Sequence, residues 1–455
     1  MSVQGRAQPL GWIDATLVVV FLLGLYLNVS LQITPRIPLT CAPSGIAGLA
    51  LLWRRRDRLE PAHLGWLLAI IALYLASILS AENYAFLGKR FTGLLQLTYS
   101  LVIAYAFFIT LVHAERRQIA TILLTFCILV VIGAFLEQYT ELRVISDKVR
   151  ERLYDSSQVY EADLRDQLLY GRIRPKLFTS EPSNVTFSYT HFAFLWLVIS
   201  PWRWKLAVYA VLMGLGFAAT PGPTLLLLLM LAVPYLIFLG GHAHDRSKRN
   251  SAIRLIGGVV LSGILVVGAV IIGSSLYAER LRDFTSGNDP STFFRVIGPM
   301  LIAFDVFKHR PWAGIGLTAE AFIENDAFTI YMNASGGVST GWYFKIAEAI
   351  TNYFWLHWIY LGLVWGTIMI VALTIWLRML RTPSILFCWA VWVILGQAAG
   401  AYVGPRAWTV LFCAAAGAVL ASRPEPARMA AGSAVSVRRY PVLASMMAAR
   451  RERLG

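Results

Sequence analysis

Residues 119–138 read IATILLTFCILVVIGAFLEQ, and the basic pair Arg116-Arg117 comes just before them. An α-helix rises about 1.5 Å per residue, so about 20 apolar residues cross the hydrocarbon core of a bilayer. The segment therefore predicts a membrane-spanning helix with positive charge at its first end. Because the same pattern recurs along the chain, it decides the fold class.

The composition indicates lipid as the surrounding medium. Of the 455 residues, 57% are hydrophobic and only 14% are charged, whereas a soluble domain is about half apolar and about a quarter charged. Apolar runs occur at residues 12–31, 37–53, 63–80, 91–113, 119–138, 185–200, 205–220, 223–240, 255–277, 352–376, 384–403 and 406–422. We predict an all-α polytopic membrane protein with about twelve transmembrane helices, in which residues 1–422 form a single transmembrane domain. The first run is too long for a signal peptide and is predicted to be the first span.

The formal net charge of +15 follows a topological pattern. Lys and Arg cluster in short segments between alternate apolar runs, as in Arg54-Arg55-Arg56, and again in the tail of residues 423–455. Such an excess of cations marks cytoplasmic loops. The pattern predicts an inner-membrane protein with both termini cytoplasmic and a basic cytoplasmic tail, and it explains the charge without nucleic acid as a partner.

Two long loops fall on the opposite, periplasmic side, at about residues 139–184 and 278–351. Loops held by a rigid scaffold often carry function, so we expect the working face there. In the first loop, apolar residues recur at helical intervals from Leu142 to Leu153. In the second, residues 291–308 predict an amphipathic helix that is kinked at Pro299 and lies on the bilayer or over the bundle.

The first candidate site lies at the end of the first loop, where Arg172, Arg174 and Lys176 come shortly before Glu181. Cations beside a helix N-terminus bind anions, and phosphate is the expected anion at a membrane surface. Glu181 could then serve as the base towards a sugar hydroxyl. The alternative is that Glu181 only caps the helix while the cations contact lipid headgroups.

The second candidate site lies in the second loop. Arg295 belongs to the predicted amphipathic helix, and His309 and Arg310 precede the glycines Gly314 and Gly316. A Gly-x-Gly turn allows close approach of the backbone to a ligand, so this turn could hold a diphosphate. His309 is a second candidate for catalysis, although a single histidine in such a place is more often a surface residue.

Two further arginines lie at the outer ends of predicted spans. Arg90 opens the fourth span and Arg406 opens the twelfth. Charges at bilayer level are costly, so they face a cavity or ligand, or else they extend to the interface. Both interpretations stay open, but this side should be poor in cations, which favours a function. Glu137, at the outer end of the fifth span, is a candidate partner for one of the arginines.

Several kinds of chemistry have no matching pattern. The sequence contains no Walker A motif, no His-Glu-x-x-His and no cysteine cluster, so we predict neither a metal nor another cofactor. Acidic residues do not run through the predicted spans, which argues against a proton-coupled transporter. The four cysteines lie in separate apolar runs, as expected of core-filling residues: Cys41, Cys127, Cys388 and Cys413.

The chain resembles the O-antigen polymerase and ligase superfamily, the Wzy-type membrane glycosyltransferases. The resemblance covers topology over nearly the whole chain and three motifs in order. Residues 172–183 are similar to the family's Arg-rich stretch ending in Glu-Pro-Ser, and residues 310–316 to its "Pro, two residues, Gly-x-Gly" signature. Asn352 with Leu361-Gly362-Leu363 is similar to its "His-Asn … Leu-Gly-Leu" segment. Ligases have His before that Asn, whereas this chain has Thr351, which favours a repeat-unit polymerase.

The resemblance implies a GT-C-like fold and a metal-independent membrane glycosyltransferase. The reaction would join undecaprenyl-diphosphate-linked oligosaccharide repeat units into exopolysaccharide or O-antigen at the periplasmic face. Expected partners are these lipid-linked oligosaccharides, membrane lipid, and a flippase and chain-length regulator of the same pathway. We expect Glu181 to act as the base and these arginines to bind diphosphate: Arg90, Arg172, Arg174, Arg295, Arg310 and Arg406. The alternatives are a ligase that transfers finished glycan to lipid A core or protein, a lipid-linked sugar flippase or transporter, and a non-catalytic assembly subunit.

Overall fold

The computed structural model describes residues 8–34, 37–81, 84–155, 159–239, 293–334, 346 and 350–423. It is 77% helical. The chain divides into a unit of residues Met1–Ala421 and a unit of residues Ser422–Gly455. The predicted span at residues 255–277 and the predicted tail beyond Arg423 lie outside the described residues.

Among the described residues, five helices are long and apolar enough to cross a membrane. They are α3 (Pro61–Leu79), α4 (Leu87–His113), α5 (Arg116–Tyr139), α17 (Tyr353–Met379) and α19 (Pro405–Ser422). Shorter apolar helices accompany them: α1 (Trp12–Leu27), α9 (Lys205–Ala219), α18 (Ile385–Gly396), and the segment Pro223–Leu239, which comprises η3 (Pro223–Leu226), α10 (Leu227–Pro234) and a π-helical turn (Tyr235–Leu239). The predicted helical class with membrane-spanning segments is confirmed, whereas the count of twelve spans stays a prediction.

The predicted spans at residues 12–31 and 37–53 are wrong where the first ends and the second begins. Between α1 and α2 (Ala42–Arg54) the chain forms an antiparallel hairpin of β1 (Leu31–Thr34) and β2 (Ile37–Leu39). Prolines at 35 and 38 remove backbone donors that a helix needs. The apolar residues on either side therefore extend instead of continuing the helices, although their hydropathy matched that of the spans.

The helix α8 (Pro182–Ile199) lies inside the bundle and is surrounded by protein. Every residue of α8 except Ser183 is buried, and the helix packs against α5, α9, α10 and α1. By contrast, α5 presents side chains such as Leu129, which is 59% exposed, at its surface. Because α8 meets protein and not lipid, its side chains can include buried polar groups such as Asn184 and His191.

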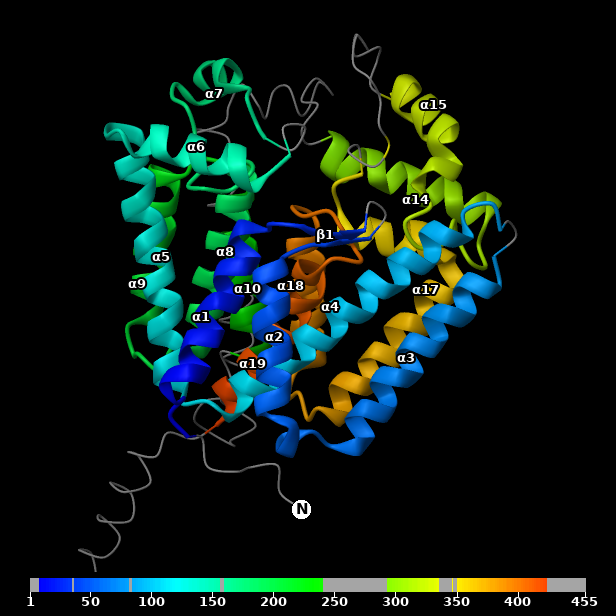
Figure 1. The fold of residues 1–455 in the computed structure, drawn as a ribbon, viewed down its shortest axis with the longest axis horizontal. Helices are drawn as coiled ribbons and strands as arrows, with labels where there is room; N and C mark the ends of the chain where they lie inside the picture. The colour runs from blue at the N-terminus through cyan, green and yellow to red at the C-terminus, as the bar shows by residue number, and fades with distance from the viewer. Residues whose placement is uncertain are drawn as a thin grey trace, which may run out of the picture. The chain divides into compact units, whose positions relative to one another are not determined.

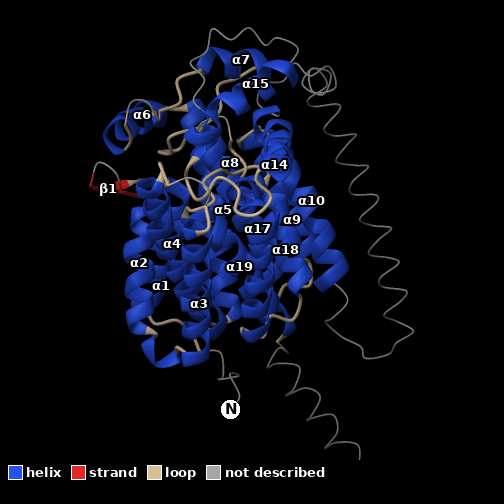
Figure 2. Ribbon diagram, turned by 90° about the vertical axis from the view of Figure 1, so that its right-hand side faces the viewer, coloured by secondary structure: helices blue, strands red, loops and turns tan. Residues whose placement is uncertain are grey.

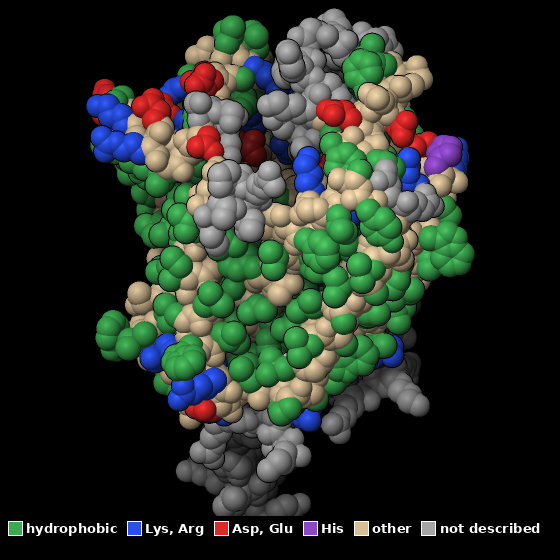
Figure 3. Space-filling view, turned by 45° about the vertical axis from the view of Figure 1, so that its right-hand side comes forward, with side chains coloured by type: hydrophobic (Ala, Val, Ile, Leu, Met, Phe, Trp, Pro, Cys, Tyr) green, Lys and Arg blue, Asp and Glu red, His purple; other side chains and the backbone are tan. Residues whose placement is uncertain are grey.

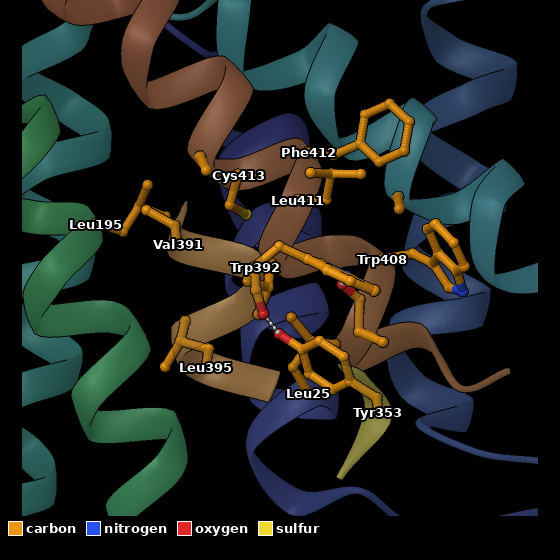
Figure 4. Packing of buried hydrophobic residues seen from close by; sticks show 14 of the residues in the cluster. Leu25, Leu195, Tyr353, Val391, Trp392, Leu395, Trp408, Leu411, Phe412 and Cys413 are labelled. Carbon is orange, nitrogen blue, oxygen red and sulfur yellow. Dashed lines mark hydrogen bonds between the residues drawn. The ribbon is translucent and has the colours of Figure 1, made fainter. Parts of the chain in front are cut away.

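Aromatic side chains fill the core between the last helices. Tyr353 at the start of α17 donates a hydrogen bond of 2.8 Å to the carbonyl of Trp392 in α18, and Trp408 of α19 packs nearby (Figure 4). All four cysteines are buried and free, in agreement with their predicted role as core-filling residues.

Helices of the two long loops gather at the same end of the bundle (Figures 1 and 2). The first loop forms α6 (Leu142–Leu153) and α7 (Asp163–Tyr170), and the second forms α14 (Gly298–His309), η6 (Glu320–Ile323) and α15 (Glu324–Ala334). A π-helical turn (Phe293–Ile297) precedes α14, and Pro299 lies in the first turn of α14, where the sequence predicted a kink. Charged side chains lie above and below a broad apolar surface (Figure 3), as expected of a protein that sits in a bilayer.

The long helix α17 is broken at Gly362, which has φ 66° and ψ −172°. The segment of residues 311–316 enters this break. Ile315 and Gly316 donate backbone hydrogen bonds to the carbonyls of Ile359 and Tyr360, at 3.0 and 2.8 Å. In return, Leu363 and the two residues after it donate to the carbonyls of Pro311 and Trp312. Non-helical backbone at membrane depth is tolerated where protein covers and pairs it, which this exchange achieves.

Candidate functional site

The segment that leads into α8 is held by a buried carboxylate. The oxygens of Glu137, at the end of α5, accept the backbone N–H groups of Lys176 and Leu177 at 3.0 and 2.6 Å. Glu137 was predicted to pair with an arginine, but both oxygens bind backbone amides instead. The Lys176 ammonium turns away and pairs with Asp163 of α7 at 3.0 Å. Glu137 therefore serves to fix the path of this segment.

The same segment contains a strained turn. Leu177 and Phe178 have φ values of 41° and 65°, in the left-handed region that side-chain-bearing residues avoid. Such residues cost about 1–3 kcal/mol each and persist when their surroundings over-determine them. Here Tyr26 donates to the Leu177 carbonyl at 3.0 Å, and Tyr154 donates to the Phe178 carbonyl at 3.1 Å. Strain held in this way is typical of sites where a neighbouring side chain must be aimed.

A buried arginine secures the next carbonyls. Arg150 of α6 is 1% exposed and donates to the carbonyls of Thr179, Ser180 and Tyr160 at 2.7, 2.9 and 3.2 Å. It also pairs with Asp147 at 2.5 Å. Since α6 and the segment before α8 are joined through one guanidinium, the first loop is held against the start of α8.

Glu181 follows directly, and its carboxylate has no partner among the described residues. It occupies the N-cap position of α8 with extended backbone, but its side chain makes no capping hydrogen bond. Within the described part of the chain, no hydrogen bond or ion pair engages its oxygens. The alternative interpretation, in which Glu181 caps the helix, holds for the position of the residue and not for its side chain. A partly exposed carboxylate without a partner beside a helix N-terminus is available for a ligand or a proton.

Glu181 faces a cavity of about 120 Å³ that both long loops line. The cavity contains three arginines, Arg165, Arg174 and Arg295, together with the N-terminal residues of α8. Its full lining is Tyr160, Arg165, Tyr170, Arg174, Glu181, Pro182, Ser183, Thr186, Pro223, Thr224 and Arg295. The structure thus brings together three residues that the sequence analysis singled out, Glu181, Arg174 and Arg295. We call this space the Glu181 cavity.

Arg174 is held rigidly at the wall of the Glu181 cavity. Its guanidinium pairs with the buried carboxylate of Asp166 at 2.8 Å and lies over the rings of Tyr160 and Tyr170. Burial by itself would lower the pKa of Arg174, but Tyr170, Asp166 and Tyr160 raise it above its ordinary value. The charge is therefore permanent and fixed in place, although Asp166 compensates part of it.

Arg165 and the two tyrosines were missed by the sequence analysis. Arg165 precedes Asp166 on α7, is exposed, and pairs with no carboxylate in the described structure. Acids and bases alternate along this loop, so nothing in the sequence separates Arg165 from its neighbours. Only the fold of α7 over the start of α8 places Arg165 in the Glu181 cavity.

Arg406 binds protein groups next to this cavity without lining it. Its guanidinium donates to the carbonyls of Leu25 and Tyr26, at 2.9 and 3.0 Å, and to the side chain of Asn184 at 2.5 Å. These carbonyls end α1, where intrahelical donors run out. Arg406 thus caps one helix and holds another, and it also interacts electrostatically with Glu181.

The glycine turn at residues 314–316 is hydrogen-bonded to α17 and to the side chain of Arg90. The amides of Ile315 and Gly316 already donate into α17, so this turn does not cradle a phosphate as the sequence suggested. Arg90 is 1% exposed and donates through Nε and Nη2 to the carbonyl of Ile315 at 3.1 and 2.7 Å. Arg90 therefore lies against the turn and does not line the Glu181 cavity.

The remaining predicted residues also lie apart from this cavity. Arg310 stacks over the ring of Phe322 at 4.6 Å, and its Nη1 is buried without a hydrogen-bond partner among the residues that the structure describes. The side chain of His309 is 65% exposed and contacts Asp305 of the preceding helical turn. Arg172 lines a neighbouring cavity. In the described residues, no group of three His, Cys, Asp or Glu side chains is arranged to hold a metal ion.

Comparison of the chain with protein-family models, with curated proteins and with solved structures gave no match.

Proposed function

We propose that the chain is a polysaccharide polymerase of the inner membrane, which joins undecaprenyl-diphosphate-linked oligosaccharide repeat units at the periplasmic face. The observation that carries the proposal is the carboxylate of Glu181, which has no partner in the described part of the chain and lies beside three arginines in one cavity at the start of α8. About twelve spans, a GT-C-like arrangement and cytoplasmic termini are part of the proposal. They rest on the alternation of basic segments and on the family resemblance.

The reaction has two electrostatic requirements. A sugar hydroxyl attacks the anomeric carbon of the donor, the bond from that carbon to the diphosphate oxygen breaks, and the hydroxyl proton must leave. Glu181 is suited to accept that proton, because its oxygens have no other partner in the described structure. Arg165, Arg174 and Arg295 supply positive charge for the diphosphate as it departs.

The surroundings keep these groups in place before substrate arrives. Asp166 fixes Arg174, and Arg150 joins the first loop to the residues just before Glu181. Charges that are already oriented cost no reorganisation when the transition state forms. The α8 N-terminus adds a partial positive charge at the same position, since Pro182, Ser183 and Thr186 line the cavity.

The decisive experiment replaces Glu181 with glutamine in the full-length protein in membranes. Loss of a general base lowers the rate about 10²–10⁴-fold, so Glu181→Gln should abolish polymer while protein level and thermal stability stay unchanged. Glu161→Gln is the matched control, because Glu161 is an exposed carboxylate of the same loop. Lipid-linked glycans extracted from the cells provide the readout. Full polymer production by Glu181→Gln would remove Glu181 from the role of base.

The same readout separates the proposal from its rivals. A polymerase without activity should leave single lipid-linked repeats at the periplasmic face. A ligase without activity should leave long lipid-linked chains, and a flippase without activity should leave single repeats on the cytoplasmic face. Arg295→Gln should reproduce the Glu181→Gln pattern, with a rate reduced about 10²–10³-fold.

A further inference from the structure

A second cavity lies beside the Glu181 cavity, where the end of α5 meets α6 and α7. Its volume is about 250 Å³. It is lined by Glu137, Gln138, Tyr139, Arg143, Gln167, Arg172, Ile173, Arg174 and Pro175. Arg174 is common to both linings and forms part of the wall between them. We call this space the Arg172 cavity.

Arg172 is the cation of this cavity that no carboxylate in the described structure compensates. Its Nη1 donates to the side-chain oxygen of Gln138 at 3.0 Å, and its Nη2 donates to the carbonyl of Ala218 at 2.5 Å. Both acceptors are neutral. Arg143 and Arg174, by contrast, pair with Asp163 at 2.5 Å and Asp166 at 2.8 Å. A guanidinium carries five N–H donors, so Arg172 retains donors for a ligand.

The neutral groups of the lining also favour an anion. The amide nitrogen of Gln138 and the side-chain amide of Gln167 have no hydrogen-bond partner among the described residues, and each can donate two hydrogens. The one carboxylate of the lining, Glu137, already accepts two backbone N–H groups. Donors therefore exceed acceptors, and a phosphate oxygen fits better than a cation or a sugar alone.

Next to the Arg172 cavity, the end of α5 and the start of α6 expose apolar side chains. Tyr139 and Leu136 on α5 are 72% and 46% exposed, and Phe135 stacks on Tyr139. Ile145 of α6 is also exposed. An exposed aromatic at the end of a spanning helix marks the level of lipid headgroups. The volume corresponds to roughly eight waters, enough for a phosphate and its neighbouring atoms but not for acyl chains.

We propose that the Arg172 cavity binds the phosphate of an anionic membrane lipid whose chains stay in the bilayer against α5. Arg172 supplies the counter-charge, and Gln138 and Gln167 donate to the phosphate oxygens. This site is separate from the Glu181 cavity, and it stands whether or not the proposed polymerase activity does. It assigns a bound lipid to the outer end of α5, where the first loop begins.

The test counts lipids that stay bound to the purified full-length protein, by native mass spectrometry after delipidation and addition of phosphatidylglycerol. Arg172→Gln should weaken binding of one phosphatidylglycerol molecule about tenfold, because a charge-assisted hydrogen bond is lost. Arg203→Gln is the charge-matched control, since Arg203 is an exposed arginine that stacks on Trp204, away from this cavity. Unchanged binding by Arg172→Gln would overturn the proposal.

A second variant keeps the test decisive if Arg172→Gln folds poorly. Gln167 is exposed, so Gln167→Glu should fold normally while placing a negative charge in the cavity and weakening phosphatidylglycerol binding about tenfold. Inorganic phosphate distinguishes the two sources of the anion. If millimolar phosphate displaces the lipid completely, or binds while the lipid does not, the site takes a free anion and the lipid assignment fails.

Discussion

Two cation-rich segments at one end of the bundle use their polar groups in opposite ways. In residues 172–183, protein partners hold the backbone, and no described residue binds the carboxylate of Glu181. In residues 310–316, the backbone amides of the turn donate into the broken helix α17, and the glycines serve close packing. Both segments looked like phosphate-binding motifs. The first presents a side chain to a cavity, whereas the second joins a loop to a membrane helix.

The arginines divide in the same way. Arg90, Arg150 and Arg406 each donate to backbone carbonyls that have no partner within a helix or sheet. A buried carbonyl without a donor is costly, above all in lipid. A cation at the loop-bearing end of the bundle therefore has two possible roles, ligand binding and pairing with irregular backbone. Contacts, and not charge, distinguish between them.

The largest loss of stability is expected where the backbone of residues 310–316 is hydrogen-bonded to the broken helix α17. Gly314 has φ 57°, and a Cβ there would lie 2.4 Å from the Ile359 carbonyl oxygen and 2.5 Å from the Gly362 nitrogen. Since both are backbone atoms, Gly314→Ala should cost about 3 kcal/mol or more. Thermal unfolding in detergent and recovery of monodisperse protein measure the loss.

Gly171→Ala is the matched control for this prediction. Gly171 has a similar φ of 68°, but a Cβ there would meet nothing within 4 Å. The backbone strain alone should cost about 1 kcal/mol. Equal losses in the two variants would mean that the contact with α17 contributes nothing.

The next largest loss of stability is expected at Arg150, which holds the backbone of the first segment. Arg150→Gln removes donors from three carbonyls and leaves Asp147 with only its longer ion pairs, at 3.8 Å, to Arg143 and Lys176. This change should cost about 3 kcal/mol and should also reduce the polymer formation that we propose for the chain. Arg152→Gln, an exposed neighbour on α6, should change stability little. Stability equal in the two variants would contradict this role of Arg150. Together with Glu181→Gln, this pair separates residues that hold the segment from the residue that it presents.

A smaller effect is expected at Tyr154, whose hydroxyl donates to the carbonyls of Leu27 and Phe178. Tyr154→Phe should cost about 1 kcal/mol. Burial raises the pKa of Tyr154 to about 12, while Arg406 and Arg150 lower it in part. The stabilisation is therefore complete below about pH 10, the ordinary pKa of tyrosine, and is lost as the pH rises through 12. The free energy of unfolding of the wild-type protein and of Tyr154→Phe, measured at pH 8 and pH 11, tests this. A difference between the two proteins that does not shrink at pH 11 contradicts the prediction.

The smallest effect is expected at His309, whose side chain is exposed and pairs only with Asp305 in the described structure. His309→Gln should change the free energy of unfolding by no more than about 0.5 kcal/mol. Product formation measured in parallel sharpens the result. A loss of the proposed polymer at unchanged stability would support the predicted catalytic role of His309 despite its position.

Much of the helical frame was predictable because apolar length is a local property. The run at 119–138 became α5, and the run at 185–200 became α8. The hairpin at residues 31–39 was missed, since hydropathy does not register what prolines do to backbone donors. In the Glu181 cavity, Glu181 and Arg174 were predicted from the cations just before a helix start, and Arg295 from its place on the amphipathic helix of the second loop. Arg165 was not, because its place depends on how α7 folds back.

The sequence by itself determined that the chain is helical with membrane-spanning segments, because the lengths of apolar runs and the placement of cations are read along the chain. The tertiary structure decided which polar groups are free. Whether a carboxylate such as Glu181 is left open, or a cation such as Arg90 is occupied by a carbonyl, depends on contacts between residues far apart in sequence. A hydrogen bond forms only when two groups come within about 3 Å of each other. For residues far apart in sequence, that distance is set by the tertiary fold and not by the local sequence pattern.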